Sequence, residues 1–158
     1  MRKENRKSNS RNFSSKITEM EEKVIEIKRV SKKTKGGNTI GFTALVVVGN
    51  RDGKVGYGYG KARNVADAIR KAFSSAKKDM YKINLTGKTI AHEVTAKVGA
   101  SKVFLKPAPE GTGIIAGGSV RTVVDLAGIK DISSKVLGSN NKLTNVRCAI
   151  KALEKLKK

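Results

Sequence analysis

The sequence of 158 residues has no tryptophan, one histidine, one cysteine and two prolines. The single cysteine, Cys148, rules out a disulfide within the chain and is typical of a reducing compartment. Cys148 and the single histidine, His92, are too few to build a His/Cys metal site. His92 alternates with apolar residues in TIAHEVTAKV, which indicates a buried or edge position. Because no acid/base pair accompanies them, we expect no enzyme, no metal and no cofactor.

Long apolar runs, aromatic residues and acidic residues are also scarce. The longest continuous apolar run is Ala44–Val48, far short of the roughly 20 residues of a membrane span. Aromatic residues make up 4% of the chain, which leaves few anchors for a helix on a lipid surface. The 13 acidic residues stand against 34 lysines and arginines, a net charge of +21. Since neutralising phosphate releases counterions, this surplus favours a nucleic-acid partner and no membrane.

Residues 1–18 are polar and basic, and they precede the first strand pattern. They lack the apolar middle of a secretory signal, although their arginine and serine content faintly resembles an organellar transit peptide. Low hydrophobicity and high charge prevent burial, so this segment predicts a disordered basic arm.

The first half of the chain predicts three antiparallel strands followed by a helix. Residues 23–30, 39–49 and 54–60 have the alternation or the β-branched content of strands, and Asp52-Gly53 marks a hairpin turn. A capping residue, Asn64, precedes the helix. Its apolar residues at helical spacing are Val65, Ile69, Ala72, Ala76 and Met80. The polar sequence NLTGK, residues 84–88, then predicts a domain boundary.

The second half predicts the order β-β-α-β-α. Residues 89–98 and 102–108 read as strands, and a helix over 119–128 closes on Gly128. A short strand over 129–138 follows. The final helix carries its apolar residues at Val146, Ala149, Ile150, Leu153 and Leu156.

The stretch KVGYGYGKA, residues 54–62, places glycine at every second position before a lysine. A Walker loop requires G-x-x-x-x-G-K-[ST], but the outer glycines here are one residue too close and Ala62 replaces the hydroxyl. The dinucleotide pattern fails because Lys61 and Arg63 stand where glycine is required. Alternation instead predicts a strand with one bare face. Either a closely packed helix or an RNA backbone could cover that face, and the sequence leaves both open.

Two further segments suit a polyanion. RVSKKTKGGN, residues 29–38, predicts a basic loop without acidic residues, in which Gly36-Gly37 permits close approach of backbone N–H groups to phosphate. Lysine-rich tips are often merely solvated, but the net charge of +21 favours nucleic-acid contact. EGTGIIAGGSVR, residues 110–121, places glycines before a helix N-terminus, which suits phosphate or a protein partner.

Three blocks carry a family resemblance: RVSKKTKGGNTIGFTALVVVGNRDGKVGYGYGKAR, GASKVFLKPAPEGTGIIAGGSVRTVVDLAGIKDI and LGSNN. Together they resemble the family of the bacterial-type fifth protein of the small ribosomal subunit, over residues 22–156. The resemblance implies an α+β fold of two small domains. Residues 19–84 would form a β-β-β-α domain similar to a double-stranded-RNA-binding domain. Residues 85–158 would form a β-β-α-β-α domain with a left-handed βαβ crossover, against the usual rule of handedness.

The resemblance also assigns candidate site residues. The family's long RNA-binding hairpin loop, beside the spectinomycin site, matches residues 29–38, and its GYGYGKAR block matches residues 56–63. Its interface with the fourth small-subunit protein, where changes reduce decoding accuracy, matches residues 111–121. The expected RNA-binding residues are Arg29, Ser31, Lys32, Lys33, Lys35, Gly36, Gly37, Asn38, Arg51, Lys54, Gly58, Gly60, Lys61 and Arg63. The expected protein-interface residues are Gly111, Thr112, Gly113 and Arg121.

The implied partners are small-subunit ribosomal RNA near the decoding region, the fourth and the eighth small-subunit proteins, and the messenger RNA entry path. The implied role is structural, contributes to translational accuracy and needs no small-molecule substrate. A cytoplasmic ribosome is expected, with an organelle ribosome as the open alternative. Composition alone would equally allow a free-standing regulator that binds double-stranded RNA or DNA. Lys142 and Val65-Ala66 stand where proline is frequent in the family, so the helix starts are the least defined part of the resemblance.

Overall fold

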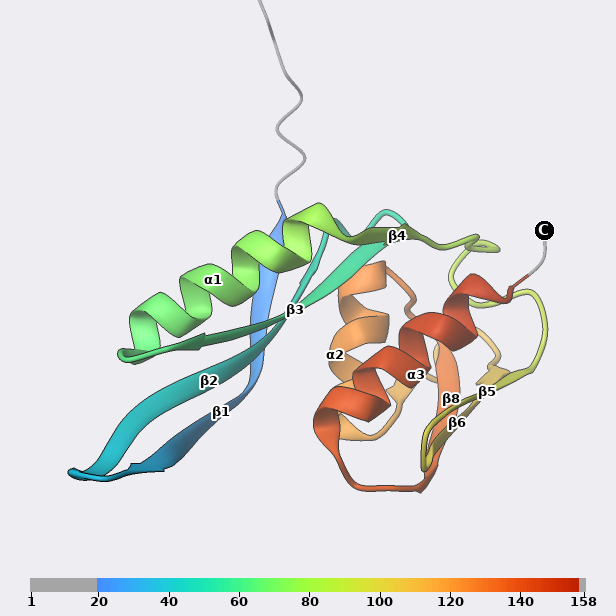
Figure 1. Cartoon of the computed structure of the whole chain (residues 1–158). Helices are drawn as coiled ribbons and strands as arrows, with labels where there is room; N and C mark the ends of the chain where they lie inside the picture. The colour runs from blue at the N-terminus through green and yellow to red at the C-terminus, as the bar shows by residue number, and fades with distance from the viewer. Residues whose placement is uncertain (1–19, 157–158) are drawn as a thin grey trace, which may run out of the picture.

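The computed structural model describes residues 20–156, and the expected basic arm, residues 1–18, lies outside them. The first sheet is antiparallel and follows the order of the chain: β1 (Glu21–Thr34), β2 (Gly37–Gly49), β3 (Lys54–Ala62) and β4 (Met80–Lys82). Helix α1 (Val65–Lys78) lies along one face of this sheet (Figure 1). The predicted β-β-β-α order is confirmed. The short β4 is an addition, since the apolar pattern placed Met80 in the helix.

The first two strands form a long hairpin where the sequence predicted a loop over residues 29–38. Pairing continues out to Thr34 opposite Gly37, and only Lys35 and Gly36 form the turn. The Thr34 hydroxyl donates a hydrogen bond to the Gly37 carbonyl oxygen at 2.8 Å. Gly37 has a φ of 129°, which an L side chain rarely adopts. The prediction of a loop over residues 29–38 was too long. Lysines on both faces of β1 remove the alternation of apolar and polar residues by which a strand is predicted.

Helix α1 packs on β3 through alanine against glycine. The buried residues of α1 recur at every fourth position: Ala68, Ala72 and Ala76. The bare face of β3 lies beneath them, and a Cβ on Gly58 would overlap the carbonyl oxygen of Ala72. Of the two alternatives left open for this face, the structure shows the closely packed helix. The expected RNA contacts at Gly58 and Gly60 are therefore corrected, because α1 buries both residues.

The second half is a mixed four-stranded sheet with two helices. The strands are β5 (Val94–Val98), β6 (Ser101–Pro107), β7 (Ile114–Ile115) and β8 (Ile132–Gly138), in the order β5-β6-β8-β7, and the helices are α2 (Gly118–Ala127) and α3 (Lys142–Glu154). The predicted order is confirmed, with β7 added. β7 and β8 pair in parallel on either side of α2 in the sequence. The left-handed sense of this crossover stays a prediction, as does the exact division into residues 19–84 and 85–158.

The position expected for His92 is corrected. His92 is exposed and lies before β5, which begins only at Val94. Val94 pairs with Leu105 in an antiparallel register. If β5 began two residues earlier, His92 would lie opposite Pro107. Proline has no N–H group to donate to a neighbouring strand, which accounts for the late start of β5.

Both helices of the second half have clear caps. Gly128, with a φ of 94°, ends α2 and donates its N–H to the last turn. The Asn141 side chain accepts a hydrogen bond from the Leu143 N–H at 3.1 Å, which fixes the start of α3 without a proline.

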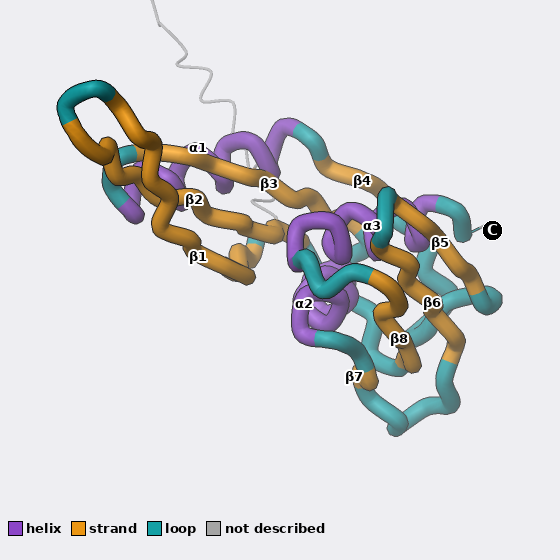
Figure 2. The backbone as a smooth tube through the Cα atoms, turned by 60° about the horizontal axis from the view of Figure 1, so that its bottom comes forward, coloured by secondary structure: helices purple, strands orange, loops and turns teal. Residues whose placement is uncertain are grey.

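The two halves share one apolar core. The face of the first sheet opposite α1 carries Leu45, Val47 and Val55, which are buried together with residues of α2, α3 and the second sheet. Helices α2 and α3 consequently lie between the two sheets (Figure 1). The turn between β2 and β3 also caps α2, since the N–H groups of Arg51 and Gly53 donate to its last carbonyl oxygens at 3.0 Å. The hairpin tip and the second sheet lie at opposite ends of the molecule (Figure 2).

Candidate nucleic-acid interface

A hollow opens between the β1–β2 hairpin and the start of α1. We call it the basic groove, and it has a volume of about 290 Å³. Its lining residues are Val30, Ser31, Lys32, Thr39, Ile40, Gly41, Lys61, Ala62, Arg63 and Lys71. Strand β1 supplies Lys32, the end of β3 supplies Lys61, and α1 supplies Lys71. Three elements thus supply lysines to one concavity, which β2 also lines.

The charge of the basic groove is uncompensated. Its cationic side chains are Lys32, Lys61, Arg63 and Lys71, and all four residues are exposed. No carboxylate lines it, and none of the four forms an ion pair within residues 20–156. Cations left without protein partners in a concave surface are suited to phosphate groups.

Two neighbouring hollows extend this surface. One, of about 490 Å³, continues over the start of α1 and is lined by Arg63, Asn64, Asp67, Arg70 and Lys71, together with Ala62. The other, of about 280 Å³, lies on the hairpin and is lined by Arg29, Ser31, Asn38 and Ile40. The candidate surface therefore runs from the hairpin to the first two turns of α1.

Most of the predicted RNA-binding residues meet on this surface. Arg29, Ser31, Lys32, Asn38, Lys61 and Arg63 line its hollows. Lys33, Lys35, Gly36 and Gly37 occupy the exposed outer end of the hairpin. Arg70 and Lys71 were not among the expected site residues. The sequence feature that could have indicated them is the basic side of α1, which directly follows the Lys61-Arg63 segment.

Arg51 and Lys54 lie elsewhere. Lys54 begins β3 and Lys61 is near its end, so about 23 Å of strand separates them. The Arg51 guanidinium donates to the Glu21 carboxylate at 2.8 Å, and its backbone N–H donates to the Leu126 carbonyl oxygen. These contacts place Arg51 at the joint between the two halves rather than in the basic groove.

Three of the four predicted protein-interface residues, Gly111, Thr112 and Gly113, lie in the loop between β6 and β7, and the fourth, Arg121, lies in the first turn of α2. The backbone N–H groups of Gly111 and Gly113 donate to the same carboxylate oxygen of Asp131, at 3.0 and 2.9 Å. Arg121 donates from its guanidinium to the Ile114 carbonyl oxygen at 2.7 Å. The sequence reasoning missed Asp131, which is 4% exposed. In the sequence, Asp131 is distinguished only as a carboxylate between the apolar residues Ile129 and Ile132, directly before β8.

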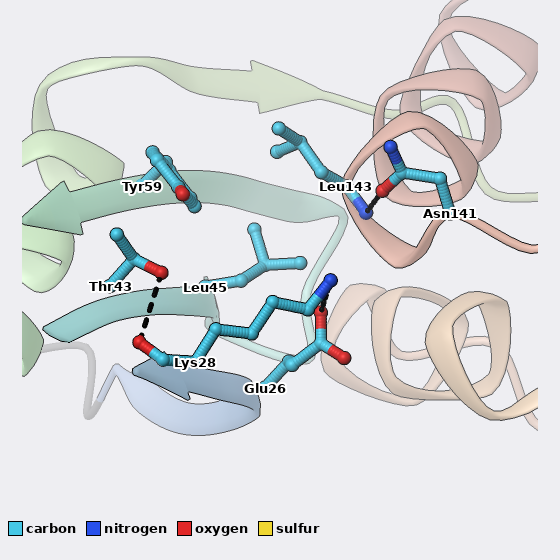
Figure 3. A pocket seen from close by; sticks show the side chains of 7 residues that line it. All are labelled: Glu26, Lys28, Thr43, Leu45, Tyr59, Asn141 and Leu143. Atoms are coloured by element: carbon cyan, nitrogen blue, oxygen red, sulfur yellow. Dashed lines mark hydrogen bonds and ion pairs between the residues drawn. The ribbon is translucent and has the colours of Figure 1, made fainter. Parts of the chain in front are cut away.

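A notch of about 150 Å³ lies where the two halves meet, lined by Glu26, Lys28, Thr43, Leu45, Tyr59, Asn141 and Leu143 (Figure 3). The Glu26 carboxylate pairs with the Lys28 and Lys142 ammonium groups at 3.2 and 3.1 Å. Burial opposes ionisation of Glu26, but these two ammonium groups outweigh it and hold the pKa of Glu26 below its ordinary value. Glu26 thereby ties β1 to the start of α3.

The single thiol of the chain, Cys148, is buried. Burial raises the pKa of the Cys148 thiol, which donates to the Ala96 carbonyl oxygen at 3.1 Å, so the thiol is not an activated nucleophile. Within residues 20–156, no group of three or more His, Cys, Asp or Glu residues could hold a metal ion. None of the helices in this range has the length and apolar character needed to cross a membrane.

Family comparison agrees with this architecture. The model described as "Ribosomal protein S5, N-terminal domain" matches residues 20–84, and "Ribosomal protein S5, C-terminal domain" matches residues 96–158. The chain belongs to the ribosomal protein S5 family. Two curated relatives are "Small ribosomal subunit protein uS5" of Campylobacter jejuni strain 81-176 and the protein of the same name from strain RM1221. Each is 58% identical over 139 residues, covering 88% of this chain and 95% of the relative.

Membership of the ribosomal protein S5 family confirms the resemblance drawn from the sequence blocks. It also confirms the expected class of function, since the chain is a ribosomal protein, a structural constituent rather than an enzyme.

Proposed function

We propose that this chain binds small-subunit ribosomal RNA through the basic groove and the β1–β2 hairpin. The observation that carries the proposal is the convergence of Lys32, Lys61, Arg63 and Lys71 in one concavity without a carboxylate partner among the described residues. The name of the Campylobacter relatives supports the small subunit as the site of assembly.

The paired hairpin suits such a role because it is already ordered. Backbone pairing holds β1 and β2 together as far as Thr34 and Gly37, so binding need not order this segment at full entropic cost. Lysines on both faces of the hairpin allow contact with phosphates of two RNA segments at once. The hairpin would act as a rigid basic wedge between RNA helices, beside the spectinomycin site.

The loop held by Asp131 supports a proposal for the finer role. We propose that Gly111, Thr112, Gly113 and Arg121 form the contact with the fourth small-subunit protein, with the eighth as a further neighbour. Gly111 and Thr112 are exposed while the loop backbone is fixed, which suits a protein contact. A rigid link there would place the chain near the decoding region and the messenger RNA entry path and would contribute to translational accuracy. The bacterial relatives support a cytoplasmic ribosome.

Co-sedimentation with small subunits through a moderate salt wash tests the proposal. We expect the chain to remain bound, and the double variant Lys32→Ala/Lys61→Ala to dissociate at lower salt. The slope of log affinity against log salt should fall by about 0.7–0.9 for each phosphate that the variant no longer neutralises. The control is Lys102→Ala/Lys135→Ala, which removes the same charge from exposed positions of the second sheet.

Two outcomes would overturn this proposal. An unchanged salt slope for Lys32→Ala/Lys61→Ala would show that the basic groove does not touch phosphate. Recovery of the wild-type chain only in the ribosome-free fraction, bound to short RNA or DNA duplexes, would favour the free-standing regulator.

A further inference from the structure

A further hollow, remote from the hairpin tip, brings two tyrosines together with basic side chains. It lies between β3, β4, β5 and α3, has a volume of about 300 Å³ and is lined by Tyr57, Tyr81, Val98, Arg147, Ile150, Lys151 and Glu154. We call it the tyrosine hollow. Its volume is at the lower end of the range for small-ligand sites, which suits one base rather than a helix.

The two tyrosines present a stacking surface. Tyr57 on β3 and Tyr81 on β4 are diagonal neighbours on the sheet face opposite α1. Their ring centroids are 6.4 Å apart and their planes differ by 10°, an offset stack. Both residues are half-buried, so the surrounding core fixes the rings while part of each remains accessible.

The rim of the tyrosine hollow is predominantly basic. The Arg147 guanidinium lies over the Tyr57 ring at 5.7 Å from its centroid. Lys151 follows one helical turn later on α3, and both residues are exposed. Neither forms an ion pair with a residue of the described range, although Glu154 also lines the hollow. Stacked rings beside unpaired cations are the elements with which proteins bind unpaired nucleotides.

We infer that the tyrosine hollow binds one unpaired nucleotide of a single-stranded RNA segment, with its base against Tyr57 and Tyr81 and its phosphate on Arg147 and Lys151. The inference rests on the proposed function only in taking RNA as the partner. It concerns a different surface from the basic groove, because the hollow is built from β3, β4, β5 and α3, with no residue of the hairpin. The chain would then hold RNA at two places, as duplex on the groove and as single strand on the hollow.

Tyrosine fluorescence gives a direct readout because the chain has no tryptophan and three tyrosines. In the variant Tyr59→Phe, only Tyr57 and Tyr81 emit. We expect a short unstructured oligouridylate to quench this emission, and 4-thiouridine in the same oligomer to cross-link to Tyr57 or Tyr81. Absence of quenching, or cross-links confined to the hairpin and α1, would overturn the inference.

Affinity measurements on full-length variants separate stacking from charge. We expect Tyr81→Leu to weaken oligouridylate binding about tenfold, within the range for loss of one stacked base, and Tyr81→Phe to retain it. The double variant Arg147→Ala/Lys151→Ala should lower the salt slope by about 0.7 for each phosphate left without its cation. Lys102→Ala/Lys135→Ala is the control of equal charge. Losses of affinity no greater than in this control would refute the assignment.

The same variants distinguish this inference from the proposed function. Lys32→Ala/Lys61→Ala should weaken binding of a short RNA duplex, whereas Arg147→Ala/Lys151→Ala should leave duplex binding intact. If only duplex binding responds, and only to the groove variant, the groove stands and the hollow fails. If polyglutamate displaces oligouridylate from the wild-type protein but not from Tyr81→Leu, the hollow is an acidic-peptide site and the inference is wrong.

Discussion

The glycines of β3 set the distance between α1 and the first sheet. Around Gly58, the carbonyl oxygen of Ala72 occupies the space that a Cβ would need. The alanines at every fourth position of α1 have the same effect from the helix side. Neither set of residues contacts the proposed RNA directly, yet both place Lys71 of α1 within the same hollow as Lys32.

The variant Gly58→Ala tests this close approach. We expect it to lower the free energy of unfolding by about 3 kcal/mol, because backbone rather than a flexible side chain must move. For a chain of this size that corresponds to a fall in Tm of roughly 6–12 °C in a thermal melt. The matched control is Gly36→Ala at the hairpin turn, where a Cβ meets nothing within 4 Å. Equal melting temperatures for the two variants would contradict the packing argument.

At the scale of elements, the loop between β6 and β7 depends on one buried carboxylate. Asp131 accepts the N–H groups of both Gly111 and Gly113, and its own N–H donates to the Lys88 carbonyl oxygen at 3.1 Å. Two glycines with φ of 88° and 73° permit the turn, but they do not hold it.

We expect Asp131→Ala to release this loop while α2 stays folded. Hydrogen exchange of the Gly111 and Gly113 amides should accelerate by about tenfold or more, in line with the loss of a hydrogen bond to a charged acceptor. Thr112→Ala is the control, since its hydroxyl bonds only to the Pro109 carbonyl oxygen on the loop itself. Unchanged protection of both amides in Asp131→Ala would show that other contacts fix the loop. Weakened binding of the fourth small-subunit protein would extend the result to function.

The order of elements was predictable from the sequence because most strands and helices carry a clear apolar period. The hairpin was not, since residues 31–34 have polar side chains on both faces and only backbone pairing defines the strand. The short β7 lies in a glycine-rich segment, and its two residues acquire strand geometry by pairing with β8. Period-based reasoning fails where the partner strand, not the side-chain pattern, determines the conformation.

The hairpin residues of the candidate site could be predicted from the sequence. The residues that α1 contributes to it were not predicted. Lys32 and Lys71 are remote in sequence, and only the packing of α1 on β3 brings them into one concavity. The glycines of β3 and the alanines of α1 were two separate patterns in the sequence, and only the position of α1 on β3 matches them. RNA binding by Arg51 stays a prediction, but its contact with the end of α2 could not be predicted, because a charged turn residue gives no sign of that hydrogen bond.

For the whole molecule, the shared core makes the two halves one thermodynamic unit. Leu45, Val47 and Val55 are fully or almost fully buried, and they are packed in the same cluster as the core of the second half. Ion pairs across the same joint link β1 to α2 through Lys23 and Asp125, and to α3 through Glu26 and Lys142. The hairpin is thus held at a fixed angle to the second sheet, so that the basic groove and the loop held by Asp131 keep a constant separation.

The joint should give the folded chain a specific response to acid. The pKa of Glu26 is lowered from 4.5 in the folded state, so its contribution to stability is complete above that value and is lost as the pH falls through the folded pKa. We expect Glu26→Gln to lower the free energy of unfolding by about 0.5–1 kcal/mol at neutral pH, as for a partly exposed ion pair. Below the folded pKa the variant and the wild type should converge.

Urea melts of both proteins from pH 7 down to pH 3 or so measure this convergence. Glu22→Gln is the control, because Glu22 is exposed and makes no ion pair within the described residues. It removes the same charge from the same strand without removing an ion pair, so its melts provide the baseline for the comparison. A constant gap between Glu26→Gln and the wild type across the whole range would mean that Glu26 acts through packing. A gap that closes on acidification, in a single cooperative transition, identifies the charge of the Glu26 carboxylate, paired with Lys28 and Lys142, as the stabilising group at the joint.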